Sequence, residues 1–445
     1  MAEQNNTSDE NRRDVFNKLT LICRNIKEVI GIDELAEKIK LMCRESDVKN
    51  KHNDSDSEDS GSKSGIKVRG YWGTAPTTSP SIAYLIPLMK FKDMIDAGIE
   101  MTLFIADTHS YLDKGCSWIE KTNERTDYYV FIINTILKSL GVRNGTYNIT
   151  RGSNVQVGIG YILNLYKFMS RITLKQAQKA GSDVVKKNKD PSIGSLVYPL
   201  MQVMDENALD ADVELGGVDQ RKIFALSRDY AESMGHDKCS YLMNEMLPSL
   251  SKAGTKMSSS DANSKIEFTD SEKIIENKIK KAYCFEGEVK DNPCVMMYKL
   301  ILWPLGYKFP KKQIVYNRAS SYVAPLGKEK CSNNDILHAA NSQTSKSDEY
   351  TKSEDTIPKS DKKQSFNSAE ASAVNSQPSL SSSQQPVIAA NIIELSYHEF
   401  EEQWKNKDIS AQELKQWLVI SINQVIDPIR KAILENKELY DAAFS

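Results

Sequence analysis

The chain has 445 residues, too many for one compact core, so its length predicts two or three domains. Hydrophobic residues make up 40% and charged residues 27% of a chain with a mean hydropathy of −0.48, which indicates folded domains combined with disordered segments. Lys and Arg number 58 against 60 Asp and Glu, which excludes a global positive field directed at nucleic acid or an anionic membrane.

The N-terminal segment 1–13 lacks the apolar stretch of a secretion signal, and no window is apolar over the length that a membrane span needs. Seven cysteines are scattered, with neither a Cys-x-x-Cys pair nor a histidine at zinc-ligand spacing. We therefore expect no metal-ligand set and no membrane partner, and a cytoplasmic location is favoured.

The first predicted elements are helical, because apolar residues recur every three or four positions from Val15 onward. We expect 1–11 to be a flexible N-terminal tail and 12–45 to form N-terminal helices. Residues 46–65 change abruptly to Ser, Asp, Lys and Asn, which predicts a disordered insert.

A strand, helix and strand follow in that order. Residues 66–73 form a β-like run that ends in the small residues of 74–80, and a helical stretch begins at Ile82. The run 101–106 is almost entirely apolar and stops at Asp107, as a buried parallel strand does. This order predicts a doubly wound sheet whose ligands bind beyond the carboxyl ends of its strands.

A second Ser-rich segment, 331–387, has few aromatic residues and is predicted to be another disordered insert. Folding is expected to resume near Ala390. Ser410 and Glu413 form a capping box at the start of a long helix, which Pro428 should kink.

The strongest local motif is Lys-Met-Ser-Ser-Ser at 256–260. A loop with one cation and several hydroxyls suits an anionic leaving group, because the lysine supplies charge to pyrophosphate oxygens while hydroxyls and amides donate hydrogen bonds. A Gly- and Ser-rich surface turn is the other interpretation, and the motif alone does not decide between the two.

Two further motifs accompany it, Tyr-Trp-Gly-Thr-Ala-Pro at 71–76 and Gly-Gly-Val-Asp-Gln-Arg-Lys at 216–222. Together the three resemble the class I aminoacyl-tRNA synthetases, specifically the eukaryotic and archaeal form of tyrosyl-tRNA synthetase. The resemblance covers the segments 12–45, 66–320 and 391–437. It implies an α/β fold, with a Rossmann-type doubly wound parallel-sheet catalytic domain followed by an α-helical anticodon-binding domain, and a homodimer.

The implied catalytic domain spans 66–270, and the implied anticodon-binding domain combines 271–330 with 388–437. Residues 438–445 are expected to be a C-terminal tail. The resemblance further implies a tyrosine–tRNA ligase that acts on L-tyrosine, ATP with Mg²⁺, and tRNA(Tyr). Tyrosyl-adenylate and pyrophosphate form first, and the tyrosyl group then passes to the 3′ end of the tRNA, which requires positioning rather than a nucleophilic side chain.

Tyr198, Gln202 and Asp205 are spaced to lie on one side of a helix, either as a pocket lining or as a polar stripe in water. The resemblance implies that Tyr198, Gln202 and Gln220 hold the ammonium group of tyrosine, while Tyr71 and Asp205 bind its phenol hydroxyl. A buried carboxylate of this kind would be left unpaired by phenylalanine. At position 214, a glutamate stands where relatives often carry Gln, and the sequence gives no interpretation of this departure.

The resemblance also assigns residues to ATP binding, namely Gly73, Thr74, Gly216, Gly217, Asp219, Met246, Leu247 and Lys256. Gly216, Gly217 and Asp219 would surround the ribose, since glycine permits close backbone approach, although a bulge or turn would also account for the glycine pair. Met246 and Leu247 would lie near the adenine.

The implied catalytic residues are Ser81, Tyr84, Lys256, Ser258 and Ser259. Residues 81–84 stand where related synthetases carry a HIGH-type tetrapeptide at the start of the helix. Ser81 replaces its usual first His, and Thr78 stands where Gly is usual. Losing one hydrogen bond to a charged oxygen costs on the order of 1.5–3 kcal/mol, so slower activation is expected. His109, just past the second strand, is either a further phosphate ligand or, as favoured here, a core or supporting histidine.

Contacts with tRNA are expected at Lys179, Trp303 and Asn317. Basic clusters within 171–189 and 308–318 would meet RNA phosphates, or are merely solvated faces. Trp303 would stack on an unpaired base or pack in a core, and Asn317 stands where relatives tend to carry an Asp that reads the anticodon.

Two alternatives remain. Ser81 and Thr78 motivate a synthetase-like protein that binds tyrosine, ATP or RNA with weak or lost activation. A tryptophan-specific relative is disfavoured, because Tyr71 and Asp205 suit a phenol rather than an indole.

Overall fold

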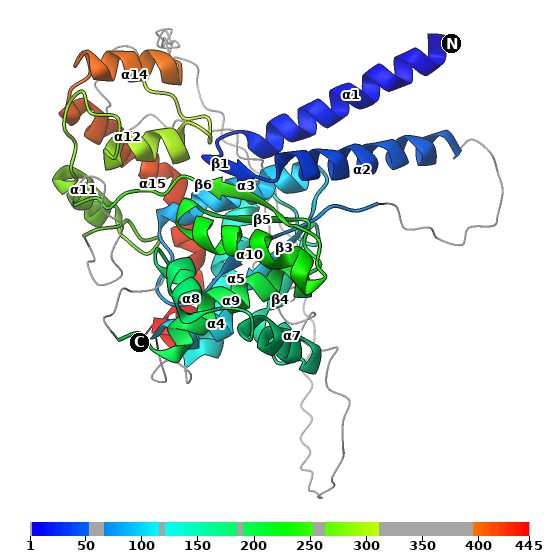
Figure 1. The fold of residues 1–445 in the computed structure, drawn as a ribbon. Helices are drawn as coiled ribbons and strands as arrows, with labels where there is room; N and C mark the ends of the chain where they lie inside the picture. Colours follow the sequence, from blue (N-terminus) through cyan, green and yellow to red (C-terminus); the bar gives the residue numbers. More distant parts are fainter. Residues whose placement is uncertain are drawn as a thin grey trace, which may run out of the picture.

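The fold was analysed in a computed structural model that describes residues 2–52, 66–114, 121–184, 190–251, 263–310 and 395–444. In this part of the chain a central sheet has the strand order β1-β6-β5-β2-β3-β4 (Figure 1). The strands are β1 (Glu28–Ile30), β2 (Arg69–Thr74), β3 (Glu100–Ile105), β4 (Asn148–Arg151), β5 (Val213–Gly217) and β6 (Ser240–Asn244). Neighbouring strands from β6 to β4 run parallel, and β1 pairs antiparallel with β6 at the edge.

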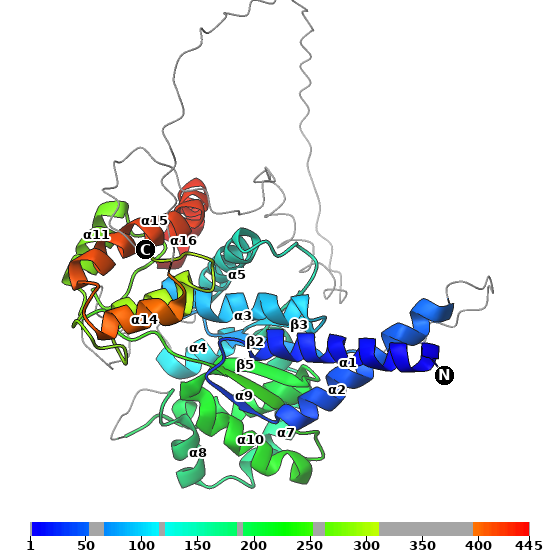
Figure 2. The same cartoon turned by 90° about the horizontal axis from the view of Figure 1, so that it is seen from above.

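Helices cover both faces of this sheet, which explains why most residues of its central strands are buried. Figure 2 shows α3 and α5 on one side and α9 and α10 on the other. The helices of this unit are α3 (Leu85–Asp96), α4 (Asp107–Lys114), α5 (Thr122–Ser139), α6 (Gly152–Gln156), α7 (Ile159–Met169), α8 (Leu174–Gly181), α9 (Ile193–Ala208) and α10 (Arg221–Met234). Because every residue of β6 is buried, its side chains contribute to packing on both faces.

The strand order reverses at β2. The chain proceeds from β2 to β3 and β4 on one side, then returns to place β5 and β6 on the other. In such sheets a crevice opens outside the carboxyl ends of the two strands at the reversal, here β2 and β5. The predicted doubly wound fold is thereby confirmed.

A helical part follows the sheet, made of α11 (Glu272–Lys281), α12 (Pro293–Met297), α14 (Tyr397–Lys405), α15 (Ala411–Glu435) and α16 (Lys437–Phe444). Its core is aromatic, with Tyr298 packed edge-on against Phe400 and Trp417 at centroid distances of 4.5 and 5.0 Å. The capping box of Ser410 and Glu413 is present, and α15 continues through Pro428. Residues 331–387, the second predicted insert, lie outside the described residues.

The N-terminal segments are more helical than expected. Helix α1 (Ala2–Cys23) includes almost all of the predicted flexible tail, and α2 (Ile32–His52) includes the first residues of the predicted insert. The remainder of that insert, 53–65, lies outside the described residues. Among the helices that the structure describes, none has the length and apolar character that a membrane crossing requires.

The predicted C-terminal tail is helix α16, which packs back on α5. The ring of Tyr128 contacts those of Tyr440 and Phe444 at centroid distances of 5.5 and 5.4 Å. Nε of Arg125 donates to the carbonyl of Ala443 at 2.9 Å. The segment expected as a C-terminal tail is thus a packed helix, because these tertiary contacts stabilise a helix too short to persist alone.

Candidate active site

The crevice at the carboxyl ends of β2 and β5 collects several of the predicted ATP-binding residues. Trp72 lies opposite Leu215 in the sheet, so Gly73 and Thr74 on β2 and the glycine pair of β5 follow at the same edge. The fold thus brings the Tyr-Trp-Gly-Thr and Gly-Gly-Val-Asp motifs together, although they are far apart in sequence.

Asp205 on α9 is the central buried carboxyl group of the crevice, with only 2% of its surface exposed. Its Oδ1 accepts hydrogen bonds from Nε2 of Gln156 at 2.7 Å and from the hydroxyl of Tyr161 at 2.8 Å. Its Oδ2 lies 3.7 Å from Nε2 of His109, farther than a hydrogen bond. Burial raises the pKa of this carboxyl well above its usual value, so a polar ligand facing Oδ2 would relieve an unfavourable site.

His109 belongs to this end of the crevice. Its ring is buried and packs edge-on against Tyr198 at 4.6 Å. Burial lowers the pKa of the imidazole to about 4, so it is neutral at pH 7. The structure therefore supports the interpretation of a supporting histidine and not that of a phosphate ligand.

Tyr71 on β2 brings a second polar group to the same place. The side chain is buried against Phe104, with ring centroids 6.2 Å apart. Within the described ranges, its hydroxyl has no hydrogen-bond partner of normal geometry. Burial, followed by the nearby Glu214, raises the pKa of the phenol, which therefore stays neutral and able to donate.

Gln202 joins α9 to the segment after β5. Its Nε2 donates to Oε1 of Glu214 and to Oε1 of Gln220, both at 2.9 Å. The five side chains assigned to amino-acid binding are thus distributed over α9, β2 and the short helix η3 (Val218–Gln220) around one region. The polar-stripe alternative is wrong for Asp205, because this carboxyl is buried.

Gln156 and Tyr161, the two donors to Asp205, were missed by the sequence analysis. They come from α6 and α7, more than 40 residues before Asp205. No local pattern marks them, since their role depends on how α6 and α7 pack against α9.

Both glycines at the end of β5 lie in close packing rather than in a turn with positive φ. A Cβ on Gly216 would lie 2.6 Å from Cζ of Phe224, and one on Gly217 would lie 2.5 Å from Oδ1 of Asp219 and 2.8 Å from Sδ of Met246. The residues expected around the ribose and adenine are therefore adjacent. Leu247, in contrast, is 5% exposed and packs in the main core.

At the phosphate end, the connection from β2 to α3 is held by backbone and hydroxyl groups. Ser81 is 7% exposed and its backbone bridges Glu267, while the amide of Ile82 donates to the carbonyl of Ile266 at 2.9 Å. The hydroxyl of Tyr84 lies 3.0 Å from Oγ1 of Thr74. Tyr84 therefore supports Thr74 at the rim of the crevice.

The residues Lys256, Ser258 and Ser259 lie outside the described residues, but both ends of their segment are placed. The amide of Leu250 donates to the carbonyl of Ser264 at 2.9 Å, which closes the base of the segment. Because Ile266 contacts Ile82, this base lies beside the start of the connection that carries Ser81. The carbonyl of Leu250 also accepts from the amide of Tyr283 at 2.7 Å, just after α11.

The residues predicted to contact tRNA, unlike those of the crevice, do not form one group in the described structure. Lys179 is exposed on α8, whereas Asn317 lies outside the described residues. Trp303 is partly buried, with its ring 6.2 Å from that of Tyr298 and 6.1 Å from that of Tyr397. Its contacts are mainly those of core packing. No three His, Cys, Asp or Glu side chains form a metal-binding group in the segments that the structure describes.

A doubly wound sheet followed by a helical part is the architecture that the resemblance to class I synthetases implies. The family described as tRNA synthetases class I (W and Y) matches residues 63–347 of the chain. This match covers more than half of the sequence, and the chain belongs to this family.

Named relatives agree with one another. The chain is 38% identical over 296 residues to the cytoplasmic tyrosine–tRNA ligase of Danio rerio, a match of 66% of this chain and 51% of that protein. It is 40% identical over 291 residues to the probable cytoplasmic tyrosine–tRNA ligase of Encephalitozoon cuniculi, covering 65% and 78%. The chain spans about half the length of the Danio rerio relative.

Solved structures show the same fold. The tyrosyl-tRNA synthetase of Archaeoglobus fulgidus, complexed with L-tyrosine, aligns with a TM-score of 0.65 and 23% identity over 94% of this chain and 99% of that one. That of Pyrococcus horikoshii, also complexed with L-tyrosine, aligns with a TM-score of 0.68 and 14% identity over 96% and 99%. These likenesses confirm the combination of a Rossmann-type domain with a helical domain.

Proposed function

We propose that the protein is a tyrosine–tRNA ligase that activates L-tyrosine with ATP and transfers the tyrosyl group to tRNA(Tyr). The observation that carries this proposal is the buried carboxyl of Asp205, which has one oxygen that accepts from Gln156 and Tyr161 and another that lies 3.7 Å from Nε2 of His109, beyond hydrogen-bond distance. Relatives of the chain are named tyrosine–tRNA ligases, which supports the same substrate.

The phenol of tyrosine would donate its proton to Oδ2 of Asp205 and accept from the hydroxyl of Tyr71. Both protein groups are buried, so a phenylalanine ring would leave them unpaired, at a cost of roughly 1–3 kcal/mol for each group. Tyr198, Gln202 and Gln220 would hold the ammonium group at the other end of the substrate. Selection of tyrosine thus follows from polar groups that only a phenol satisfies.

Activation requires the tyrosine carboxylate to attack the α-phosphorus of ATP while pyrophosphate leaves. The glycine pair of β5, Gly73 and Thr74 would admit the nucleotide, which arrives as its Mg²⁺ complex because this ion commonly binds substrate phosphates. Lys256, with the hydroxyls of Ser258 and Ser259, would stabilise charge on the leaving group. Ser81 and the backbone of its connection would face the α-phosphate.

We further propose that 66–270 is the catalytic domain and that 271–330 with 388–437 is the anticodon-binding domain. Lys179 would meet RNA phosphates near the catalytic end, while Trp303 and Asn317 would lie at the anticodon end. The names of the relatives support a cytoplasmic location.

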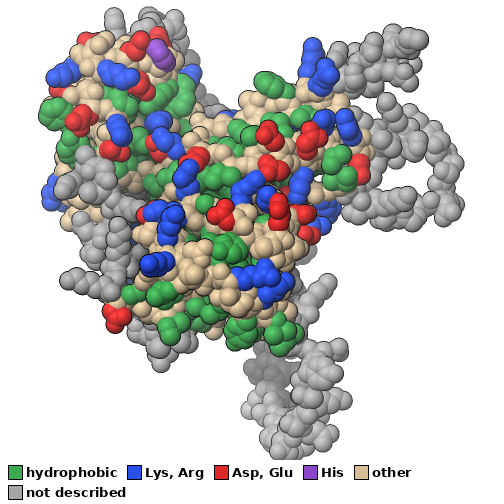
Figure 3. Space-filling model, viewed as in Figure 1, with side chains coloured by type: hydrophobic (Ala, Val, Ile, Leu, Met, Phe, Trp, Pro, Cys, Tyr) green, Lys and Arg blue, Asp and Glu red, His purple; other side chains and the backbone are tan. Residues whose placement is uncertain are grey.

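A homodimer is proposed from an apolar surface on and just before α7. Val157, Ile159, Leu163 and Tyr166 expose between 58% and 76% of their surface. Figure 3 shows hydrophobic side chains gathered over this part of the molecule. A second copy is the proposed occupant, because several large exposed apolar side chains on one helix mark an interaction surface and the resemblance implies a homodimer. Light scattering tests this, and a Leu163→Glu variant should become monomeric.

The deciding experiment is tyrosine-dependent exchange of pyrophosphate into ATP, followed by charging of tRNA(Tyr). Exchange well above that of a Lys256→Ala variant, with tyrosine preferred over tryptophan and phenylalanine, is expected. Tyrosine binding without exchange would establish the alternative of a synthetase-like protein that has lost activation, for which the buried neutral Ser81 is the specific reason. Exchange with tryptophan alone would overturn the choice of substrate.

A further inference from the structure

Two buried carboxyl groups lie behind the amino-acid pocket, and the proposed reaction does not use them. Glu206 follows Asp205 on α9 and is 6% exposed, while Glu214 in β5 is 2% exposed. The two carboxyl groups interact with each other electrostatically. A hydrogen bond between them requires a proton on one of them, because two carboxylates offer acceptors only.

The other contacts of the two groups lead to the same requirement. Oε2 of Glu206 accepts from Oγ of Ser227 at 2.6 Å and from the hydroxyl of Tyr241 at 2.9 Å. Oε1 of Glu214 accepts from Gln202. The remaining oxygens, Oε1 of Glu206 and Oε2 of Glu214, have no donor among the described residues. One shared proton satisfies both orphaned oxygens at once.

We propose that Glu206 and Glu214 share one proton and that this carboxyl pair positions Gln202 and Tyr71 for amino-acid binding. The proposal rests on the proposed function for the identity of the ligand, while the shared proton is a property of the chain alone. Glu206 and Glu214 are positioning residues, since neither is assigned a contact with substrate.

The positioning of Gln202 follows from its hydrogen bonds. Its amide nitrogen donates one hydrogen to Glu214 and the other to Gln220, so both N–H groups are engaged. Its carbonyl oxygen is consequently the group left to accept from a ligand ammonium. Glu214 accepts from Gln202 and also lies beside the hydroxyl of Tyr71, so one carboxyl contacts side chains at both ends of the proposed tyrosine site.

The titratable groups around the pair are acids. Asp205 faces it from α9, Tyr71 from β2, and Tyr241 and Cys239 from β6 and the residue before it. Burial raises the pKa of Glu206 to about 7 and that of Glu214 well above its usual value. Loss of the shared proton as the pH rises through this range would place two negative charges side by side. Repulsion would then move Glu214 away from Gln202 and Tyr71.

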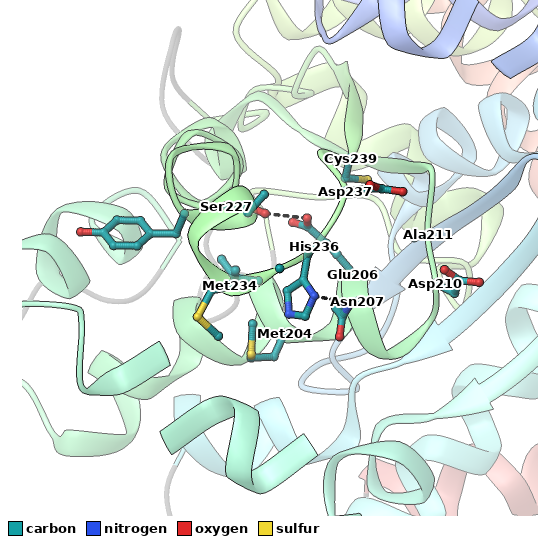
Figure 4. Close-up of a pocket in the computed structure, with 14 residues that line it drawn as sticks. Met204, Glu206, Asn207, Asp210, Ala211, Ser227, Met234, His236, Asp237 and Cys239 are labelled. Carbon is teal, nitrogen blue, oxygen red and sulfur yellow. Dashed lines mark hydrogen bonds between the residues drawn. The ribbon is translucent and has the colours of Figure 1, made fainter. Parts of the chain in front are cut away.

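A separate cavity of about 260 Å³ between α9 and α10 reaches Glu206 (Figure 4). Ser227 and Glu206 line its floor, and the exposed Asn207, Asp210 and Asp237 lie at its mouth, with His236 bonded to Asn207. Asp205 does not line it. Water in this cavity would exchange protons with the pair while the amino-acid pocket is occupied.

The test is the KM for tyrosine as a function of pH in wild type and in the isosteric variant Glu214→Gln. In wild type, KM should rise about tenfold between about pH 7 and about pH 8.5 with little change in kcat, because one proton is required for binding. Glu214→Gln cannot form a doubly charged pair, so its KM should change less than about twofold over that range. A variant profile that follows wild type overturns the proposal.

The matched control is Glu232→Gln on the exposed side of α10, where the carboxylate pairs with Lys238 on the surface. It should keep the wild-type pH profile. A second readout needs no substrate: an infrared titration of the protein alone should show one protonated carboxyl lost near neutral pH in wild type and in Glu232→Gln, with a shifted midpoint in Glu214→Gln. An unshifted midpoint in Glu214→Gln overturns the pair. Absence of tyrosine-dependent exchange in wild type would instead refute the proposed function.

Discussion

The two ends of the crevice are built differently. At the amino-acid end, Asp205, Tyr71 and Glu214 are almost fully buried, and the two carboxyl groups accept hydrogen bonds from side chains of α6, α7 and α9. At the phosphate end, the nucleotide would meet glycines, short hydroxyls and a lysine carried on a segment whose two ends meet at Leu250 and Ser264. From this difference we expect selectivity for tyrosine to depend on the buried polar groups at the amino-acid end. The rate of the proposed activation step should depend on the positive charge near the leaving group.

The largest effect is expected from Lys256→Ala, which removes positive charge from the pyrophosphate site. We expect kcat for ATP–pyrophosphate exchange to fall by about 10² to 10³, with the dissociation constant for tyrosine changed less than about threefold. Exchange kinetics and tyrosine calorimetry measure the two quantities separately. Equal losses in both would contradict the division between the two ends.

Asp205→Asn tests the amino-acid end. The amide keeps the size of the carboxyl but presents a donor or a neutral acceptor to the phenol, so kcat/KM for tyrosine should fall tenfold to a hundredfold, corresponding to about 1.5–3 kcal/mol. The value for phenylalanine should change much less, so the tyrosine-to-phenylalanine ratio should collapse. Steady-state exchange with each amino acid measures this. An unchanged ratio would show that selectivity lies elsewhere.

The stability of the amino-acid end should depend on pH in a defined direction. The pKa of Glu206 is raised from an unfolded value of 4.5 to about 7, so the native state binds more protons between these values and unfolding becomes easier as pH rises through them. This amounts to about 3 kcal/mol for one group. His109, with a pKa lowered to about 4, acts oppositely, losing stability as pH falls below its unfolded value of 6.5.

The two opposed contributions are separated by comparing variants. Glu214→Gln should gain stability relative to wild type as pH rises from about 5 to about 8, while the contribution of His109 remains in both proteins. Urea denaturation across this range measures the difference. A constant difference at all pH values would mean that the carboxyl pair does not titrate there.

The smallest effect is expected from Ser81→Ala. The side chain of Ser81 makes no capping hydrogen bond within the described residues, and the connection is held by backbone bonds at Ile82. We expect a decrease in kcat of less than about tenfold with unchanged stability, since one neutral hydroxyl is lost. Thermal denaturation and exchange kinetics report both. A loss as large as that of Lys256→Ala would assign Ser81 a larger part in the reaction.

The sequence analysis could name the site residues that belong to a local motif within one helix or strand. Tyr198, Gln202 and Asp205 follow helical spacing, which alone left a polar stripe in water open, and their roles, like those of Gly73 and Gly216, came from the resemblance of the motifs. Gln156 and Tyr161 are joined to Asp205 only by the packing of three helices, and no spacing in the chain encodes such a contact. The sequence showed that a Glu stands at position 214 where relatives often carry Gln. Its role could be interpreted only once the fold placed Glu206 and Gln202 beside it.

Chain ends were the weakest predictions for a related reason. Polar composition suggested free tails, yet α1 extends to Ala2 and α16 packs on α5 through Tyr440 and Phe444. Short helices gain most of their stability from what they touch, and a neighbour such as Tyr128 lies more than 300 residues earlier in the chain.

The backbone of Leu250 bonds to two parts of the chain that are otherwise separate. Its N–H donates to the carbonyl of Ser264, on the far side of the segment 252–262, and its C=O accepts from the amide of Tyr283, just after α11. A shift of Tyr283 would therefore change the backbone of the same residue that holds the two ends of this segment together.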